Sequence, residues 1–143
     1  MDGNIYKKAR RVAGMTQERW AEALGVAVDS IRRYENGERM PDDTTVRVMA
    51  ELSGLTILEL WHLRGKSVIA ERRLPEVEHV PLPEAVIGLL LQVRELTPRV
   101  DALLEIAQDG QVTPDEVELY EQICAELGEV IRAAMAVRYA AIG

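Results

Sequence analysis

The stretch that decides the fold is TQERWAEALGVAVDSIRRYENG, residues 16–37. Its apolar residues recur every three or four positions, which is the spacing of an amphipathic helix. Gly25 separates two such segments, and Asn36-Gly37 follows the second. Glycine closes a helix without steric cost because it has no Cβ atom. The stretch therefore predicts two short helices, 16–24 and 27–35, joined by a tight turn.

Three further segments with helical spacing flank this pair. They cover residues 4–13, 43–52 and 56–63, and a glycine follows each within two positions. No run of alternating β-branched residues is long enough to predict a strand. The sequence thus predicts an all-α fold that begins with a five-helix domain over residues 1–65.

Proline marks the boundary of a second part. Pro75, Pro81 and Pro83 stand among charged residues, and we predict a linker over 66–83. Helical spacing returns at 84–107, with an interruption expected near Thr97-Pro98, because proline lacks the N–H that a helix needs.

The last helix has a clear start signal. Thr113-Pro114-Asp115-Glu116 combines a capping hydroxyl, proline at the first helical position and a glutamate three residues after the cap. Residues 84–143 are therefore expected to form a helical hairpin.

Charge is distributed unevenly over the two parts. The net charge is −7, but residues 1–66 carry eleven basic and ten acidic side chains, whereas residues 67–143 carry six basic and fourteen acidic ones. The first part is +1 and the second is −8. Only the first could readily approach a phosphate backbone.

Residues 16–37 also have the features of a helix-turn-helix unit. Ala21 is small enough for a close helix crossing, Gly25 permits the turn, and Ile31 can fill the space between the helices. The second helix would then expose one face that fits a DNA major groove. That face holds Ala27, Val28, Asp29, Arg32 and Arg33.

The sequence resembles the Cro and phage-repressor-like helix-turn-helix family, also called the xenobiotic-response-element family. The resemblance covers residues 4–63. Its signature is Met15-Thr16-Gln17, Leu24-Gly25-Val26 and the run Ile31-Arg32-Arg33-Tyr34-Glu35-Asn36-Gly37, followed by Pro41. The resemblance implies a sequence-specific transcriptional regulator that binds double-stranded DNA.

The resemblance also implies roles for single residues. Gln17 and Asn36 would contact the DNA backbone, and Arg10 would pair with Glu35 as a structural ion pair. The base edges would be contacted by Val28, Asp29, Arg32 and Arg33.

The chemistry of these side chains fits such roles. Arg32 or Arg33 could bind guanine through two hydrogen bonds, Asp29 could accept one from cytosine, and Val28 could contact a thymine methyl group. The helix start at Thr16 offers backbone N–H groups to a phosphate, and Arg39 is a further candidate for phosphate contact.

Surplus apolar residues mark the second part. The apolar residues of 84–107 and 113–137 form several stripes at helical spacing, and two helices packed on each other can bury only one stripe each. We expect residues 84–143 to form a homodimer, which suits a repressor that occludes polymerase at a palindromic operator. Two alternatives remain open: a monomer whose helices fold back on the first domain, and a protein-interaction module, such as an antitoxin or adaptor, whose acidic half binds a basic partner.

Other functional classes find little support. The sequence shows no catalytic triad, metal cluster or phosphate-binding glycine loop, so we expect no enzyme, no metal and no cofactor. His62 and His79 are interpreted as isolated, and the lone Cys124 as a helix-packing residue. The absence of a long apolar stretch and of a secretory signal predicts a cytoplasmic protein with no membrane contact. The sequence leaves open whether a small-molecule effector exists.

Overall fold

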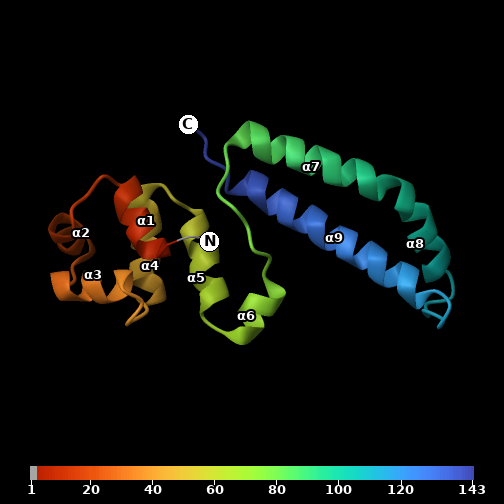
Figure 1. The fold of residues 1–143 in the computed structure, drawn as a ribbon, viewed down its shortest axis with the longest axis horizontal. Helices are drawn as coiled ribbons and strands as arrows, with labels where there is room; N and C mark the ends of the chain where they lie inside the picture. Colours follow the sequence, from red (N-terminus) through yellow and green to blue (C-terminus); the bar gives the residue numbers. More distant parts are fainter. Residues whose placement is uncertain (1–2) are drawn as a thin grey trace. The chain divides into compact units, whose positions relative to one another are not determined.

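The computed structural model describes residues 3–143, which fall into two compact units, Met1–Leu74 and Pro75–Gly143 (Figure 1). Nine α-helices and one short 3-10 turn make up the regular structure of this described range, which has no strand beyond an isolated bridge. The predicted all-α class is confirmed.

The first unit contains six helices. They are α1 (Ile5–Val12), α2 (Gln17–Leu24), α3 (Val28–Glu35), α4 (Asp43–Ser53), α5 (Ile57–Gly65) and α6 (Val68–Arg73). The side-chain oxygens of Asn4, Thr16 and Asp42 cap the starts of α1, α2 and α4, respectively. Each accepts a hydrogen bond from a backbone N–H that the helix itself leaves unpaired.

A well-filled core holds these helices together. Helix α2 packs against α3, and α1 packs against α3, α4 and α5. Trp20, Ile31, Met49 and Leu58 are almost completely buried at the centre. Such burial is the main favourable term in folding, so this unit has its own hydrophobic core.

Helix α6 lies inside the stretch 66–83 that the sequence analysis assigned to a linker. Ser67 starts the helix, because its hydroxyl oxygen accepts a hydrogen bond from the Ala70 N–H at 3.1 Å. Leu74 ends it in an extended conformation, which is favoured before Pro75. Within 66–83, irregular chain is thereby limited to residues 66–67 and 74–81.

The second unit is a helical hairpin. Helix α7 (Leu82–Leu96) passes through the 3-10 turn η1 (Thr97–Arg99) into α8 (Val100–Ala107), and α9 (Val117–Arg138) returns along α7. The interruption falls at Thr97-Pro98 as predicted. Helix α9 begins four residues after Thr113, although the Thr113 N–H still donates to the Glu116 carboxylate at 2.9 Å, which is one half of the expected capping box.

A short backbone bridge closes the open end of the hairpin. The Ala141 N–H donates to the Val80 carbonyl oxygen at 2.9 Å, and the Leu82 N–H donates to the Ala141 carbonyl oxygen at 3.2 Å. The segment after α9 is thus fastened to the segment that begins α7.

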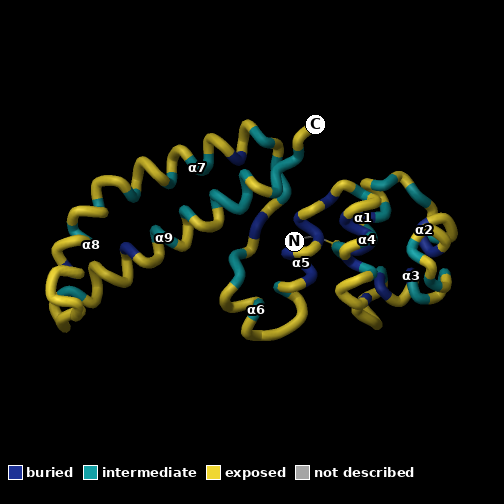
Figure 2. Tube along the Cα trace, turned by 180° about the vertical axis from the view of Figure 1, so that it is seen from behind, coloured by how far each residue is buried: buried dark blue, intermediate teal, exposed yellow. Residues whose placement is uncertain are grey.

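The hairpin has little core of its own. Its buried apolar residues are Val77, Ala85, Ile106 and Ile123, whereas fourteen of the eighteen in the described chain belong to the first unit. Figure 2 shows the same contrast, with long exposed stretches along α7, α8 and α9. Helices α7, α8 and α9 therefore leave most of this unit's apolar side chains at least partly in contact with water.

Candidate nucleic-acid interface

The turn between α2 and α3 sets the angle of the two helices. Gly25 has a φ of 68°, in the left-handed region that favours glycine. The Val26 N–H donates to the Ala21 carbonyl oxygen at 3.0 Å and closes the turn. Ala21 is 2% exposed, so its small side chain allows the close crossing that was predicted.

Helix α3 keeps one face in the core and turns the other to solvent. Ile31 and Tyr34 are buried and fix the helix against the domain. Three of the four side chains expected at base edges, Asp29, Arg32 and Arg33, are exposed. Val28 is half-buried, so only part of its side chain is available for contact.

Two of these side chains pair with each other. Arg33 Nε lies 3.0 Å from Asp29 Oδ2, one helical turn away, and both side chains are more than half exposed. Exposed ion pairs at this spacing contribute at most about 1 kcal/mol, so either partner can exchange its contact for a better one.

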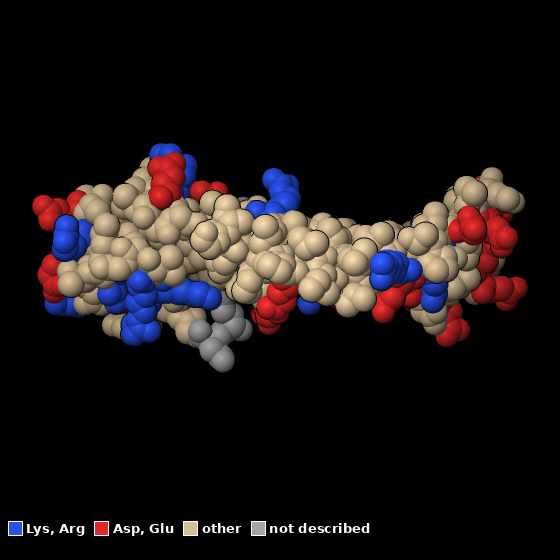
Figure 3. Space-filling view, turned by 90° about the horizontal axis from the view of Figure 1, so that it is seen from above, with Lys and Arg blue, Asp and Glu red and all other residues tan. Residues whose placement is uncertain are grey.

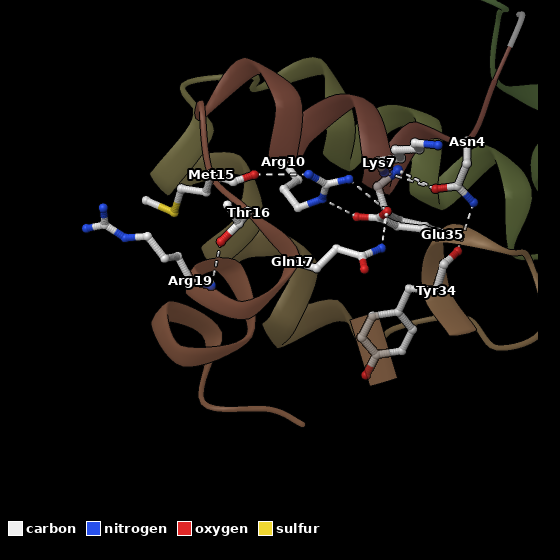
Figure 4. Close-up of polar contacts among 10 residues, drawn as sticks. Asn4, Lys7, Arg10, Met15, Thr16, Gln17, Arg19, Tyr34 and Glu35 are labelled. Carbon is white, nitrogen blue, oxygen red and sulfur yellow. Dashed lines mark hydrogen bonds and ion pairs between the residues drawn. The ribbon is translucent and has the colours of Figure 1, made fainter. Parts of the chain in front are cut away.

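The end of α3 is fastened by a nearly buried ion pair. Arg10 Nε and Nη2 donate to the two oxygens of Glu35 at 2.5 and 3.0 Å, and Gln17 Nε2 also donates to Glu35 at 3.0 Å (Figure 4). Only 4% of the Glu35 side chain is exposed. The structure thus brings together three residues for which the sequence predicted roles, and it directs the Gln17 amide toward Glu35.

Hydrogen bonding decides the ionisation of this pair. Burial acts to raise the pKa of Glu35, but hydrogen bonds from Arg10 and Gln17, with the charges of Arg10 and Lys7, outweigh it and leave the pKa lowered. The hydrogen bond to Glu35 raises the pKa of Arg10. Both groups are therefore held in their charged forms.

The remaining residues predicted to contact the DNA backbone are Thr16 before α2, and Asn36 and Arg39 after α3. The Thr16 hydroxyl accepts a hydrogen bond from the Arg19 N–H at 3.2 Å, so its oxygen serves as a helix cap. Asn36 is exposed at the carboxyl end of α3. The central carbon of the Arg39 guanidinium lies over the Tyr34 ring, 5.9 Å from its centroid, which is the distance of a weak cation–π contact.

Comparison with known proteins agrees with this geometry. Residues 7–60 match the profile of the helix-turn-helix family. These residues form a Cro/C1-type helix-turn-helix domain. The family resemblance predicted from the sequence is confirmed.

One similar protein is the HTH-type transcriptional regulator ImmR of Bacillus subtilis (strain 168). It is 30% identical to the chain over 84 residues, which are 59% of this chain and 64% of that protein. The chain thus spans less than two thirds of that relative's length. No solved structure matches the chain significantly.

The helix-turn-helix domain also contains a series of hydrogen-bonded polar side chains that was not predicted from the sequence. His62 is 3% exposed, and its Nδ1 and Nε2 lie 2.8 Å from the Tyr6 hydroxyl and 2.9 Å from Asp43 Oδ1. Lys66 Nζ lies 2.6 Å from the same Asp43 oxygen. The interpretation of His62 as isolated was wrong, because this histidine links α1, α4 and α5.

The surroundings of these polar side chains shift the pKa values of Tyr6 and Asp43. Burial raises the pKa of Tyr6 to about 12, so its hydroxyl keeps its proton and can donate to His62 Nδ1. A hydrogen bond from Lys66, and to a smaller extent one from His62, lowers the pKa of Asp43. With a proton on Nε2, the His62 ring can donate to Asp43 while Nδ1 accepts from Tyr6.

Residues 3–143 offer neither a membrane-spanning helix nor a metal site. None of the helices is both long enough and apolar enough to cross a bilayer. Within the same described range, no group of three or more His, Cys, Asp and Glu side chains is arranged to hold a metal ion.

Proposed function

We propose that this chain is a sequence-specific DNA-binding transcriptional regulator that places α3 in the major groove. The observation that carries the proposal is the exposed polar face of α3 within a Cro/C1-type helix-turn-helix domain. The major groove of B-DNA admits one α-helix, and its base edges present hydrogen-bonding patterns that such a face can read. The similar protein from Bacillus subtilis is named as a transcriptional regulator.

The contacts follow from the positions of the side chains. We assign Val28, Asp29, Arg32 and Arg33 to contacts with the bases. Thr16, Gln17, Asn36 and Arg39 are assigned to contacts with the sugar-phosphate backbone. Gln17 remains suited to this task although it donates to Glu35, because its amide nitrogen carries a second hydrogen. One hydrogen then holds the side chain while the other reaches a phosphate oxygen.

We further propose that the chain acts as a homodimer through residues 84–143. The hairpin buries few apolar residues and exposes many, and a second copy offers the missing surface. Two copies would also place two α3 helices on the halves of a palindromic site. We define the hairpin face as Val86, Leu90 and Val93 of α7 with Val117, Tyr120, Cys124 and Ile131 of α9.

Helical spacing supports the hairpin face as one surface. With 3.6 residues per turn, the stripe on α7 lies next to the residues of α7 that pack against α9, and the stripe on α9 lies next to those that pack against α7. Because the two helices run in opposite directions, we place both stripes on the same side of the hairpin. Residues 85–93 carry no charged side chain. Figure 3 shows a broad uncharged stretch on the α7 side of the hairpin. Such a surface fits an apolar partner better than DNA.

The hairpin face supplies a large part, but not all, of the apolar area that a dimer interface buries. Five of the seven side chains of the hairpin face are each 38–46% exposed, Ile131 is 55% exposed and Cys124 is also exposed. Burying one such side chain completely removes on the order of 100 Å² from water, so the exposed parts amount to roughly 300 Å² per copy. Standard interfaces bury roughly 800 Å² per partner, of which somewhat more than half is apolar.

As a dimer on its operator, the protein would act as a repressor by excluding polymerase from the site. This direction of regulation rests on the family resemblance. A second candidate function is a protein-interaction module, favoured by the charge of −8 over residues 67–143, which would attract a basic partner.

Selection of bound duplexes from a random pool, repeated at two salt concentrations, tests the main proposal. An enriched palindrome would support a dimeric operator-binding regulator and would give the half-site spacing. A loss of affinity at higher salt, with the same palindrome enriched, would show that phosphate contacts add to base contacts. Absence of enrichment at either salt would overturn it and favour the interaction module. Transcription in vitro from a promoter that carries the selected site then distinguishes repression from activation.

A further inference from the structure

Asp29 and Arg33 form the ion pair on the exposed face of α3. Asp29 is the second residue of the helix and Arg33 the sixth. The carboxylate oxygen Oδ2 of Asp29 lies 3.0 Å from Nε of Arg33, with side-chain exposures of 67% and 55%. Arg32 is also exposed, and it makes no ion pair with any residue of the described range 3–143.

The contact favours one position of the guanidinium. Helical side chains lean toward the amino end of their helix, and Asp29 is one turn nearer that end than Arg33. The carboxylate therefore biases the guanidinium toward the first turns of α3, by at most about 1 kcal/mol. In helix-turn-helix complexes, the amino-terminal residues of the recognition helix approach the base edges.

While the contact is formed, it also determines which nitrogen atoms of Arg33 remain available. Asp29 engages Nε, which leaves the two terminal nitrogens of Arg33 to donate elsewhere. Guanine presents two acceptors, O6 and N7, in the major groove, and arginine binds both at once. A guanidinium restrained in this way has less conformational freedom to lose when it binds.

We propose that Asp29 is a positioning residue that directs Arg33 to a guanine and thereby sets the base preference of the domain. This inference rests on the proposed DNA-binding function. Asp29 also repels phosphate groups, so it keeps Arg33 from settling on the DNA backbone and disfavours non-specific binding. Arg32 has no such partner, so its guanidinium is not directed in this way.

The experiment compares the sequences that five proteins select from a random duplex pool. They are the wild type, Asp29→Ala, Asp29→Glu, Arg33→Ala and the control Glu51→Ala. Glu51 pairs with Arg47 on α4 at the same helical spacing and with similar exposure, so its removal changes the net charge and breaks an ion pair in the same way. Tryptophan fluorescence checks that every variant is folded.

We expect the wild type, Glu51→Ala and Asp29→Glu to prefer guanine at one position of each half-site. Arg33→Ala should lose that preference by roughly tenfold or more. Asp29→Ala should lose most of the same preference at the same position, while its binding to unselected DNA becomes tighter because an acidic group is gone.

The failures of the two proposals can be told apart. If the wild type enriches no site, the DNA-binding proposal falls and this inference falls with it. If the wild type enriches a site and Asp29→Ala keeps its guanine preference, this inference alone is overturned. The same holds if Asp29→Ala loses a cytosine preference at another position, because Asp29 would then read a base itself.

Discussion

Arg10 of α1 binds both carboxylate oxygens of Glu35, the last residue of α3. The same guanidinium donates through Nη1 to the Met15 carbonyl oxygen at 3.0 Å. One side chain thus joins α1, the connection between α1 and α2, and the carboxyl end of the proposed recognition helix. The orientation of α3 therefore depends on a contact that lies outside its DNA-facing surface.

Removing Arg10 should destabilise the helix-turn-helix domain strongly. Arg10→Ala leaves the Glu35 carboxylate nearly buried without its cation, and such losses cost about 3 kcal/mol. Urea unfolding followed by tryptophan fluorescence measures this directly, because Trp20 and Trp61 both lie in the first unit. The control Arg47→Ala breaks an exposed ion pair and should cost less than about 1 kcal/mol.

A double-mutant cycle separates the ion pair from other effects of the substitution. The variant Arg10→Ala/Glu35→Ala should lose clearly less free energy of unfolding than the sum of the two single variants, because no buried charge is left unpaired. Additive losses would show that the two side chains contribute independently and that the ion pair does not fasten α3.

The stability of the domain should fall in acid. The pKa of Glu35 is lowered in the folded protein, so its contribution is fully present above the unfolded pKa and is lost as the pH falls through the folded pKa. We expect the free energy of unfolding to decrease from about pH 5 downward. Glu35→Gln should be less stable than the wild type at neutral pH and should show a shallower acid dependence. A slope unchanged by this variant would contradict the assignment to Glu35.

Local signals explain what the sequence predicted well. Thr16 and Gly25 mark the ends of α2 through capping and a left-handed φ, which depend on neighbouring residues only. The Asp29–Arg33 pair follows from the same local spacing and was within reach of sequence reasoning. The start of α6 was also signalled locally, by Ser67, but the prolines that follow outweighed it in our interpretation.

Contacts between distant residues explain what was missed. Tyr6, Asp43 and His62 belong to three helices, and no spacing in the sequence shows that their polar atoms meet. The second role of Gln17 as a donor to Glu35 likewise depends on how α2 packs beside α3. Such tertiary contacts require the packed domain, whereas the helices that carry them can be predicted from the chain.

The buried hydroxyl of Tyr6 should contribute to stability through His62. Tyr6→Phe keeps the ring but leaves His62 Nδ1 without its 2.8 Å partner, and a buried polar atom left unpaired costs about 1–3 kcal/mol. Urea unfolding measures the loss, with Tyr139→Phe in the second unit as the control. An unfolding free energy within a few tenths of a kcal/mol of the wild type, the usual scatter of such comparisons, would show that the hydroxyl contributes nothing.

The hairpin face should determine the oligomeric state. Leu90→Asp places a charge at the centre of this face, where its desolvation would oppose association, and we expect a monomer at micromolar concentration by light scattering. Leu91→Asp introduces the same charge at the next residue of α7, which is also exposed but lies outside the hairpin face. It should remain a dimer.

The two variants also connect the hairpin to DNA binding. A monomeric Leu90→Asp should retain the base preference of one half-site but lose the enrichment of a palindrome, since the two α3 helices are no longer joined. If the wild type is itself monomeric, the homodimer is excluded. If Leu91→Asp dissociates and Leu90→Asp does not, the copies associate through another side of α7, and the hairpin face is assigned to the wrong residues.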